Sequence, residues 1–364
     1  YGPDEIAARL ADELPKWTYE DGWIRRKYKT SGWKATLIAV GLPGVLLALL
    51  VLLMHEPARS HRHAHGTFGL IVREIGSALP PFTLLTIYHM AGRAGLRRNL
   101  YLAAGTAAVS WALVALTGDL AQWAACGFGA YSIATWGQVQ SYGDKPLFSL
   151  TYGDSTFVLC VISTALVACI SAGFSVWAAP LAMRTFTHVS PVTFGFGLGL
   201  TYMVGSIIGV VAGGWLTDLW KSKDLRAPLG MTGIALIGMV PGISVIVLSK
   251  SIEVFFIGYF FQAIFTAMWS GGIAALVQDL VLPRMRGAAA ACYSLVAIVV
   301  ASGIGPYWTG KVSKITGSLG TGILSILLLA PITLVILWLA AKRLPVETAD
   351  KRLMRAAAAG EPIE

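Results

Sequence analysis

Charged residues are scarce in this 364-residue chain. Asp, Glu, Lys and Arg make up 13% of it, hydrophobic residues make up 55%, and the mean hydropathy is +0.67. Soluble globular domains carry about twice this share of charge, so the composition excludes that class and predicts a membrane protein. We interpret the net charge of +9 as basic residues flanking membrane spans, and we expect no nucleic-acid binding.

Cysteine is also scarce, and its placement argues against disulfide and zinc frameworks. The four cysteines lie inside apolar runs without ligand-like spacing: Cys126, Cys160, Cys169 and Cys292. Four histidines gather in "HEPARSHRHAH": His55, His61, His63 and His65. A metal clip is one interpretation, but a solvated or headgroup-facing cluster fits this basic stretch better. No GxSxG, HExxH or Walker motif is present, so we expect no enzyme, no cofactor and no metal site.

Long apolar runs are what the chain does contain. A helix needs about 20 mostly apolar residues to cross a bilayer, and about nine such runs occur. They lie at 34–54, 100–117, 120–139, 156–183, 193–218, 229–249, 254–282, 287–310 and 318–341. The second and third are short and closely joined, so they form either two spans or a re-entrant hairpin. The expected fold class is an all-α polytopic membrane helix bundle.

The polar segments between the runs predict an orientation. Residues 1–33 are expected to be an exposed segment with an amphipathic helix, 55–99 a basic connector, and 346–364 a tail. With the loop at 219–228 in the cytoplasm, cytoplasmic segments hold 17 Lys and Arg, and the opposite loops after residue 156 hold four. This asymmetry follows the positive-inside rule, although the basic residues of 1–33 run against it.

The stretch "GGWLTDLWKSKDLRA" at 213–227 carries the most specific pattern. Gly214, Leu216 and Asp218 have G-x-L-x-D spacing at the end of an apolar run, and dispersed basic residues follow. A carboxylate at a helix end beside cations can latch helices that must separate and rejoin. Solvated charges at the end of a span are the simpler interpretation.

This pattern resembles the cytoplasmic-loop signature of the major facilitator superfamily, with Leu219 where the signature usually has arginine. Further stretches resemble its Spinster-like branch: "GLPG" at 41–44, "HEPAR" at 55–59, "LPRMRGAAAA" at 282–291 and "GIGPYWTG" at 303–310. The resemblance implies that 156–345 is the six-helix C-terminal half of a transporter. It also implies that 34–54 is the last helix of the N-terminal half, with five helices before it, and that 100–155 is an inserted hairpin and loop.

The resemblance implies a cytoplasmic gate, and the sequence suggests a hinge. Gate residues by this comparison are Gly214, Asp218, Lys221, Lys223, Arg226, Arg284 and Arg286. Pro306 frees a backbone carbonyl within its helix, so Gly303, Gly305 and Pro306 are candidate hinge residues, although such prolines also occur in static bundles. No ionisable residue lies near the middle of the six C-terminal spans, so we assign no proton-coupling residue there.

Uncharged polar and aromatic residues face the middle of these spans instead. The candidates for a solute cavity are Gln262, Tyr202, Ser206, Trp177, Tyr259 and Tyr293, with Gln262 the strongest. For each of them, packing and hydrogen bonding between helices is the simpler role.

These observations predict a secondary transporter that moves an amphipathic or lipid-like solute, of lysolipid or sphingoid type by resemblance, through alternating access with proton coupling. A symporter for small organic anions or sugar acids is the alternative within transport. A non-transporting membrane subunit or a truncated remnant is the alternative from another class. The expected partners are the solute and membrane lipids. The expected location is the cell membrane, of bacterial inner-membrane type, with a monomer once the N-terminal half is present.

Overall fold

The computed structural model describes residues 32–53, 81–346 and 349–362. The chain divides into two units, residues 1–67 and 68–364, which we describe separately. In the first unit the described element is α3 (Gly32–Leu52), an apolar helix that contains Pro43 and coincides with the run expected at 34–54. Most of the segment expected at 1–33, and the histidine cluster at 55–65, lie outside the described residues.

The second unit is built from helices. They are α5 (Phe82–Thr117), α6 (Leu120–Gly143), α7 (Lys145–Leu150), α8 (Ser155–Thr185), α9 (Pro191–Lys221), α10 (Ala227–Leu248), α11 (Ile252–Met268), α12 (Ser270–Asp279), η1 (Pro283–Met285), α13 (Arg286–Thr316), α14 (Leu319–Ile326), α15 (Leu329–Arg343), η2 (Leu344–Val346) and α16 (Ala349–Ala358). No β-strand occurs within the described ranges, and the all-α fold class is confirmed.

Seven helical segments are long and apolar enough to cross a membrane: Phe82–Thr117, Ser155–Thr185, Pro191–Lys221, Ala227–Leu248, Ile252–Asp279, Pro283–Thr316 and Leu319–Arg343. The chain is therefore a multi-pass membrane protein. The last six segments match the six spans expected between 156 and 345. The other two of the nine expected spans also correspond to helices, namely α6 and α3. Neither is among the seven segments that are long and apolar enough to cross a membrane, and the described apolar stretch of α3 covers only Gly41–Leu52.

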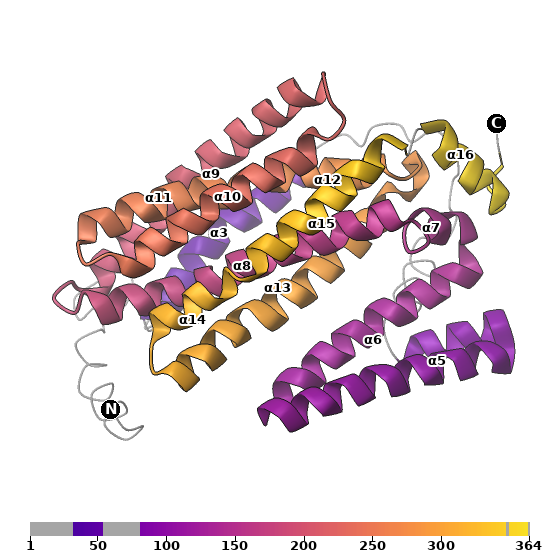
Figure 1. The fold of residues 1–364 in the computed structure, drawn as a ribbon, viewed down its shortest axis with the longest axis horizontal. Coiled ribbons are helices and arrows are strands. Elements are labelled where there is room, and N and C mark those ends of the chain that lie inside the picture. Colours follow the sequence, from indigo (N-terminus) through magenta and orange to yellow (C-terminus); the bar gives the residue numbers. More distant parts are fainter. Residues whose placement is uncertain (1–31, 54–80, 347–348, 363–364) are drawn as a thin grey trace. The chain divides into compact units, whose positions relative to one another are not determined.

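The six C-terminal segments form a bundle around α8, the most deeply buried of them (Figure 1). α8 packs along α13 and α15, α9 packs along α11, and α10 packs against α11 and α15. The close contact between α9 and α11 requires glycine at two positions of α9. A Cβ on Gly209 would overlap the backbone at Ile264, and a Cβ on Gly213 would overlap the backbone at Met268. The small-residue spacing in α9 thus allows close helix packing.

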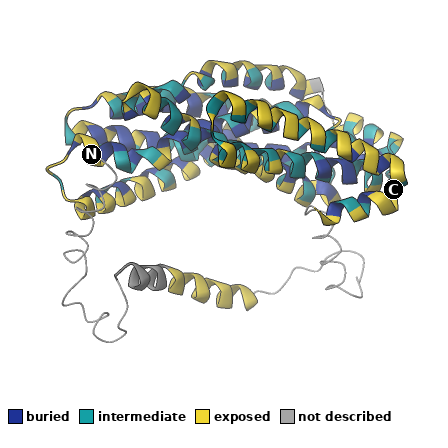
Figure 2. Ribbon diagram, turned by 90° about the horizontal axis from the view of Figure 1, so that it is seen from below, coloured by how far each residue is buried: buried dark blue, intermediate teal, exposed yellow. Residues whose placement is uncertain are grey.

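Burial follows the bundle geometry. Buried residues lie on the faces that meet other helices and exposed residues on the outward faces (Figure 2). Phe174, Phe194 and Phe255 lie in one buried cluster, and Phe157 and Met285 lie in a second. Along α9 the outward face is almost wholly apolar, as expected of a helix that meets lipid or other apolar helices.

The boundary expected between the connector and the first helix of the hairpin was wrong. α5 begins at Phe82, directly after Pro80 and Pro81, so residues 82–99 are helical and do not belong to the connector predicted at 55–99. Proline is common at helix starts, whereas the three arginines in this stretch made it look like an exposed loop. Gly92 interrupts α5 with φ 58° and ψ −149°, a conformation open mainly to glycine.

A buried polar network holds α5 against α6. The Asn99 amide donates to Thr135 Oγ1 at 3.1 Å and to Gln138 Oε1 at 2.9 Å, and the Tyr131 hydroxyl donates to Asn99 Oδ1 at 2.6 Å. The Gln138 amide donates to the Gly95 carbonyl at 2.9 Å. Since Asn99 is paired through both its donor and its acceptor groups, the network fixes the register of the two helices.

Candidate functional site

A charged cluster joins three helix ends at the side expected to face the cytoplasm. Lys221, the last residue of α9, places Nζ 2.7 Å from Oδ2 of Asp279, the last residue of α12. Arg286, the first residue of α13, places Nη2 4.0 Å from Oδ1 of the same carboxylate. Arg352 of α16 donates to the backbone carbonyl of Asp279. One carboxylate therefore links the second, fourth and fifth segments of the bundle. We call Lys221, Asp279 and Arg286 the latch.

A second ion-pair group lies around Arg284. Its guanidinium donates two hydrogen bonds to Asp144, at 2.7 Å and 3.2 Å, and its Nε donates to Glu361 Oε1 at 2.6 Å. Asp144 also caps α7, because Oδ1 accepts from the Leu147 N–H at 3.0 Å. Burial raises the pKa of Asp144, but the hydrogen bonds from Arg284 and Leu147 bring the net pKa below its ordinary value. The hydrogen bond from Arg284 likewise lowers the pKa of Glu361. Arg284 thus fixes the loop before α7 and the chain after α16.

The remaining predicted gate residues form fewer contacts with other helices. Among the described residues Asp218 has no ion pair, and its side chain is exposed at the end of α9. Lys223 and Arg226 are exposed in the following turn, where Asp224 Oδ1 accepts from the Arg226 N–H at 2.9 Å. Gly214 has open space where a side chain would be. The structure therefore brings Lys221 and Arg286 together on Asp279, a residue that sequence reasoning missed.

Among the predicted cavity residues, Tyr202 and Tyr259 form a pair. Their ring centroids are 6.3 Å apart, and they belong to α9 and α11. Tyr259 is 8% exposed and stacks on Phe255 at 6.1 Å, whereas Tyr202 is 40% exposed. The two rings therefore form an aromatic pair in which Tyr259 is buried and Tyr202 is exposed.

Gln262 and Trp177 make hydrogen bonds within the protein. Gln262, 2% exposed, donates from Nε2 to Thr266 Oγ1 at 2.7 Å on the same helix, and its Cβ lies near Gly242 of α10. Trp177 donates from Nε1 to the Pro306 carbonyl at 2.9 Å and so joins α8 to α13. Both side chains are therefore hydrogen-bonded within the protein in this conformation.

Ser206 differs from these two residues. Its hydroxyl is buried and has no hydrogen-bond partner among the described residues, and the same holds for the indole N–H of Trp269 at the break between α11 and α12. Tyr293 is half-buried and packs against the cluster that contains Phe157 and Met285. Together with Thr309 of α13, Ser206 and Trp269 thus carry buried polar atoms in the bundle that have no hydrogen-bond partner among the described residues.

The predicted hinge residues lie in tight contacts. α13 is continuous from Arg286 to Thr316 although it contains Pro306. The Gly303 carbonyl accepts a hydrogen bond from Gln122 of α6, and a Cβ on Gly305 would overlap the Cys169 carbonyl of α8. Bending at these positions would require both contacts to change.

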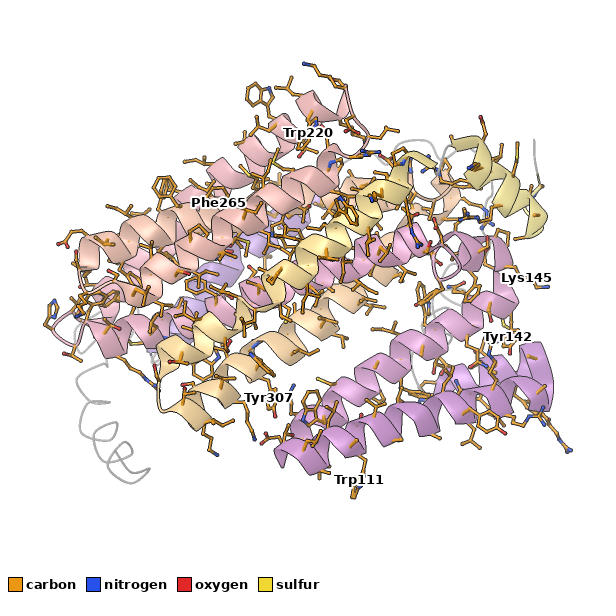
Figure 3. The ribbon with its side chains drawn as sticks, in the orientation of Figure 1. Trp111, Tyr142, Lys145, Trp220, Phe265 and Tyr307 are labelled. Atoms are coloured by element: carbon orange, nitrogen blue, oxygen red, sulfur yellow. The ribbon has the colours of Figure 1, made fainter. Side chains whose placement is uncertain are left out.

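The tip of the α5–α6 hairpin docks on the same part of α13. Asp119 Oδ2 accepts from Lys311 Nζ at 2.6 Å and from the Tyr307 hydroxyl at 2.7 Å, and Lys311 also donates to the Thr117 carbonyl at 2.5 Å. Trp123 meets the Tyr307 ring edge to face at 5.3 Å. Tyr307 is labelled in Figure 3, where it lies on α13 near the hairpin tip. We call Asp119, Tyr307 and Lys311 the tip clamp.

Within the described ranges no group of three or more His, Cys, Asp and Glu residues could hold a metal ion, and the four cysteines are free thiols.

The chain was compared with known proteins. It matches no known protein family and no curated protein. One solved structure with a similar arrangement is a bacterial homolog of the human lysosomal transporter Spinster, in an inward-facing and unoccupied conformation. The sequence identity is 16%, the TM-score is 0.49, and the match covers 94% of this chain and 65% of the other. The chain thus spans less than two thirds of that structure's length, and this similarity alone assigns no activity or substrate.

Proposed function

We propose that this chain belongs to a secondary transporter of the major facilitator type that moves an amphipathic solute by alternating access. The observation that carries the proposal is the latch, in which Asp279 links the ends of α9, α12 and α13 through Lys221 and Arg286. These side chains are 33% to 50% exposed, so each pair contributes little stability. A weak ionic contact between helix ends suits a contact that opens and closes in each cycle.

The proposed solute site lies on the bundle near Tyr202, Tyr259 and Ser206. The tyrosine pair offers apolar area and a phenol at the exposed side, and the unpaired hydroxyl of Ser206 offers a hydrogen bond. An apolar surface with few polar groups suits a solute with a lipid-like tail and a small head, such as a lysolipid or a sphingoid compound.

We also propose that transport is coupled to protons. In the described helices α8 to α15, the carboxylates lie at or near helix ends: Asp218, Glu253 and Asp279. Coupling through a carboxylate near the bilayer centre would therefore involve residues outside this bundle. The proposed location is the bacterial inner membrane, and the proposed working unit is a monomer that includes an N-terminal half.

Flux through proteoliposomes tests the proposal. The full-length protein is reconstituted, and uptake of a labelled lysolipid and of a labelled sugar acid is measured with and without a pH gradient. We expect lysolipid flux that the gradient accelerates, and we expect the Ser206→Val variant to lower it more than Ser294→Val, an exposed serine on α13. Sugar-acid flux alone would favour the organic-anion alternative. Flux of neither solute would contradict transport and favour a non-transporting membrane subunit.

A further inference from the structure

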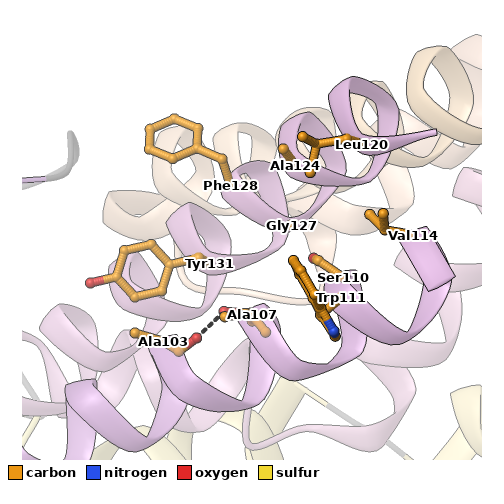
Figure 4. Close-up of a pocket in the computed structure, with 11 residues that line it drawn as sticks. Ala103, Ala107, Ser110, Trp111, Val114, Leu120, Ala124, Gly127, Phe128 and Tyr131 are labelled. Atoms are coloured by element: carbon orange, nitrogen blue, oxygen red, sulfur yellow. Dashed lines mark hydrogen bonds between the residues drawn. The ribbon is translucent and has the colours of Figure 1, made fainter. Parts of the chain in front are cut away.

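A groove runs along the outer surface between α5 and α6. Figure 4 shows residues that line it, and its volume is about 330 Å³. The lining residues all come from these two helices: Ala103, Thr106, Ala107, Ser110, Trp111, Val114, Leu120, Ala124, Gly127, Phe128 and Tyr131. Small side chains and the aromatic rings of Trp111, Phe128 and Tyr131 line the groove together.

Two hydroxyl groups of the groove form hydrogen bonds within the protein. Thr106 Oγ1 donates within α5, at 3.0 Å, to the carbonyls of Leu102 and Ala103. The Tyr131 hydroxyl donates to the buried Asn99. Most of the lining residues are apolar and these two hydroxyls are paired, so the groove offers a largely apolar surface, and an apolar chain is the occupant that such a surface fits.

Headgroup recognition can come from the start of α5. The part of this helix after the interruption at Gly92, Arg93 to Thr117, has 25 residues, which is about 37 Å at 1.5 Å per residue, whereas the hydrocarbon core is about 30 Å thick. Residues from Leu100 to Thr117 are apolar and long enough for most of that thickness, so the arginines before Leu100 fall at headgroup level. Arg93, Arg97 and Arg98 are all exposed, and none has an ion pair among the described residues.

Helix geometry separates these arginines into two groups. Arg93 and Trp111 are about five turns apart, so they share a face of α5. Arg97 is one turn beyond Arg93 on the same side, whereas Arg98 points about 100° away from Arg97. Arg93 thus shares the face of the groove residue Trp111, Arg97 lies about 40° round the helix from Arg93, and Arg98 lies about 140° round, away from that face.

We propose that the groove binds one acyl chain of an anionic phospholipid whose phosphate is held by Arg93 and Arg97. Arginine forms paired hydrogen bonds with phosphate oxygens, which supplies the selectivity for charge. The cytoplasmic leaflet, where this end of α5 is expected to lie, carries the anionic lipids. The bound lipid is a resident of the hairpin surface, distinct from the transported solute, so the proposal stands independently of transport.

Quenching of Trp111 by brominated lipids tests the proposal. The full-length protein is reconstituted in zwitterionic bilayers that contain increasing fractions of dibrominated phosphatidylglycerol or dibrominated phosphatidylcholine. The chain has 12 tryptophans, so the signal of Trp111 is taken as the difference between the wild type and Trp111→Phe. We expect half-maximal quenching at a fraction of the anionic lipid on the order of tenfold lower than for the zwitterionic lipid.

Paired variants decide between the proposed site and general attraction to charge. Arg93→Gln combined with Arg97→Gln should abolish the anionic preference, whereas Arg98→Gln should retain it. Ala107→Phe, which fills the groove, should also abolish it, and Ala108→Phe on the adjacent exposed position should not. Equal quenching by both lipids would overturn the proposal. So would a loss of the anionic preference in Arg98→Gln as large as the loss in the Arg93→Gln, Arg97→Gln double variant.

Discussion

Lys311 Nζ lies 2.6 Å from Asp119 Oδ2, so an ion pair joins α13 of the bundle to the tip of the α5–α6 hairpin. The contact reaches the part of α13 that contains Gly303 and Pro306, the residues predicted as a hinge. Hydrogen bonds from Lys311 and Tyr307 lower the pKa of Asp119, so this carboxylate stays ionised throughout the neutral range. The hairpin is thus attached where α13 would have to bend.

Removing the cation of the tip clamp should loosen the hairpin tip. In Lys311→Met we expect the half-buried thiol of Cys126, which lies close to Gly303, to react with N-ethylmaleimide roughly two- to fivefold faster. Lys314→Met is the matched control, because Lys314 lies one turn further along α13 and forms no ion pair within the described part of the chain. Equal acceleration in both variants would indicate a general charge effect and contradict the clamp.

Adjacent glycines in α9 should respond differently to the same substitution. Gly213→Ala places a methyl group against the Met268 backbone and should cost about 1–3 kcal/mol of stability, since the two helices would have to separate. Gly214→Ala enters open space and should be neutral or slightly stabilising, because alanine favours the helix. Thermal unfolding in detergent measures both. A similar melting temperature for the two variants would show that α9 and α11 do not approach as described.

Acid should release α16 from the rest of the protein only at low pH. The pKa values of Asp144 and Glu361 are lowered in the folded protein, so their contribution is complete above the unfolded values near 4 and is lost as pH falls through the lowered values. We expect hydrogen-exchange protection of α16, corrected for intrinsic rates, to be constant from about pH 8 to pH 5 and to fall only below about pH 4.

The variant Arg284→Gln provides the control for this acid response. Without the guanidinium, α16 should be less protected at neutral pH and should lose the acid-dependent step, while α15 serves as the internal reference. A fall in α16 protection between pH 8 and pH 5 would point to a different titrating group.

The helices of the bundle could be predicted from the sequence because apolar length alone identifies a span. The six runs after residue 156 correspond to α8 through α15, although the breaks at Trp269 and between α14 and α15 were not anticipated. The start of α5 was missed, because the helical stretch 82–99 combines arginines with apolar residues and follows two prolines. A helix that reaches the membrane surface need not be apolar, so hydropathy cannot locate such an end.

The partner of the predicted gate could not be found in the same way. Asp218 matches a sequence pattern, but the carboxylate that pairs with Lys221 is Asp279, which is 58 residues away along the chain. Which helix ends meet depends on how α9, α12 and α13 pack, and periodicity within one helix carries no such information. The available signal was the position of Asp279 at the end of a span, a few residues before Arg284 and Arg286.

The latch is the central claim, and the distance between spin labels at Leu219 of α9 and Ala275 of α12 tests it most directly. Both positions are exposed and lie outside the latch itself. In the reconstituted wild-type protein we predict a distribution with one dominant short distance. Asp279→Asn should add a population at longer distance by removing the charge of the shared carboxylate, and Asp218→Asn should leave the distribution unchanged. An Asp279→Asn distribution identical to the wild type would contradict the account.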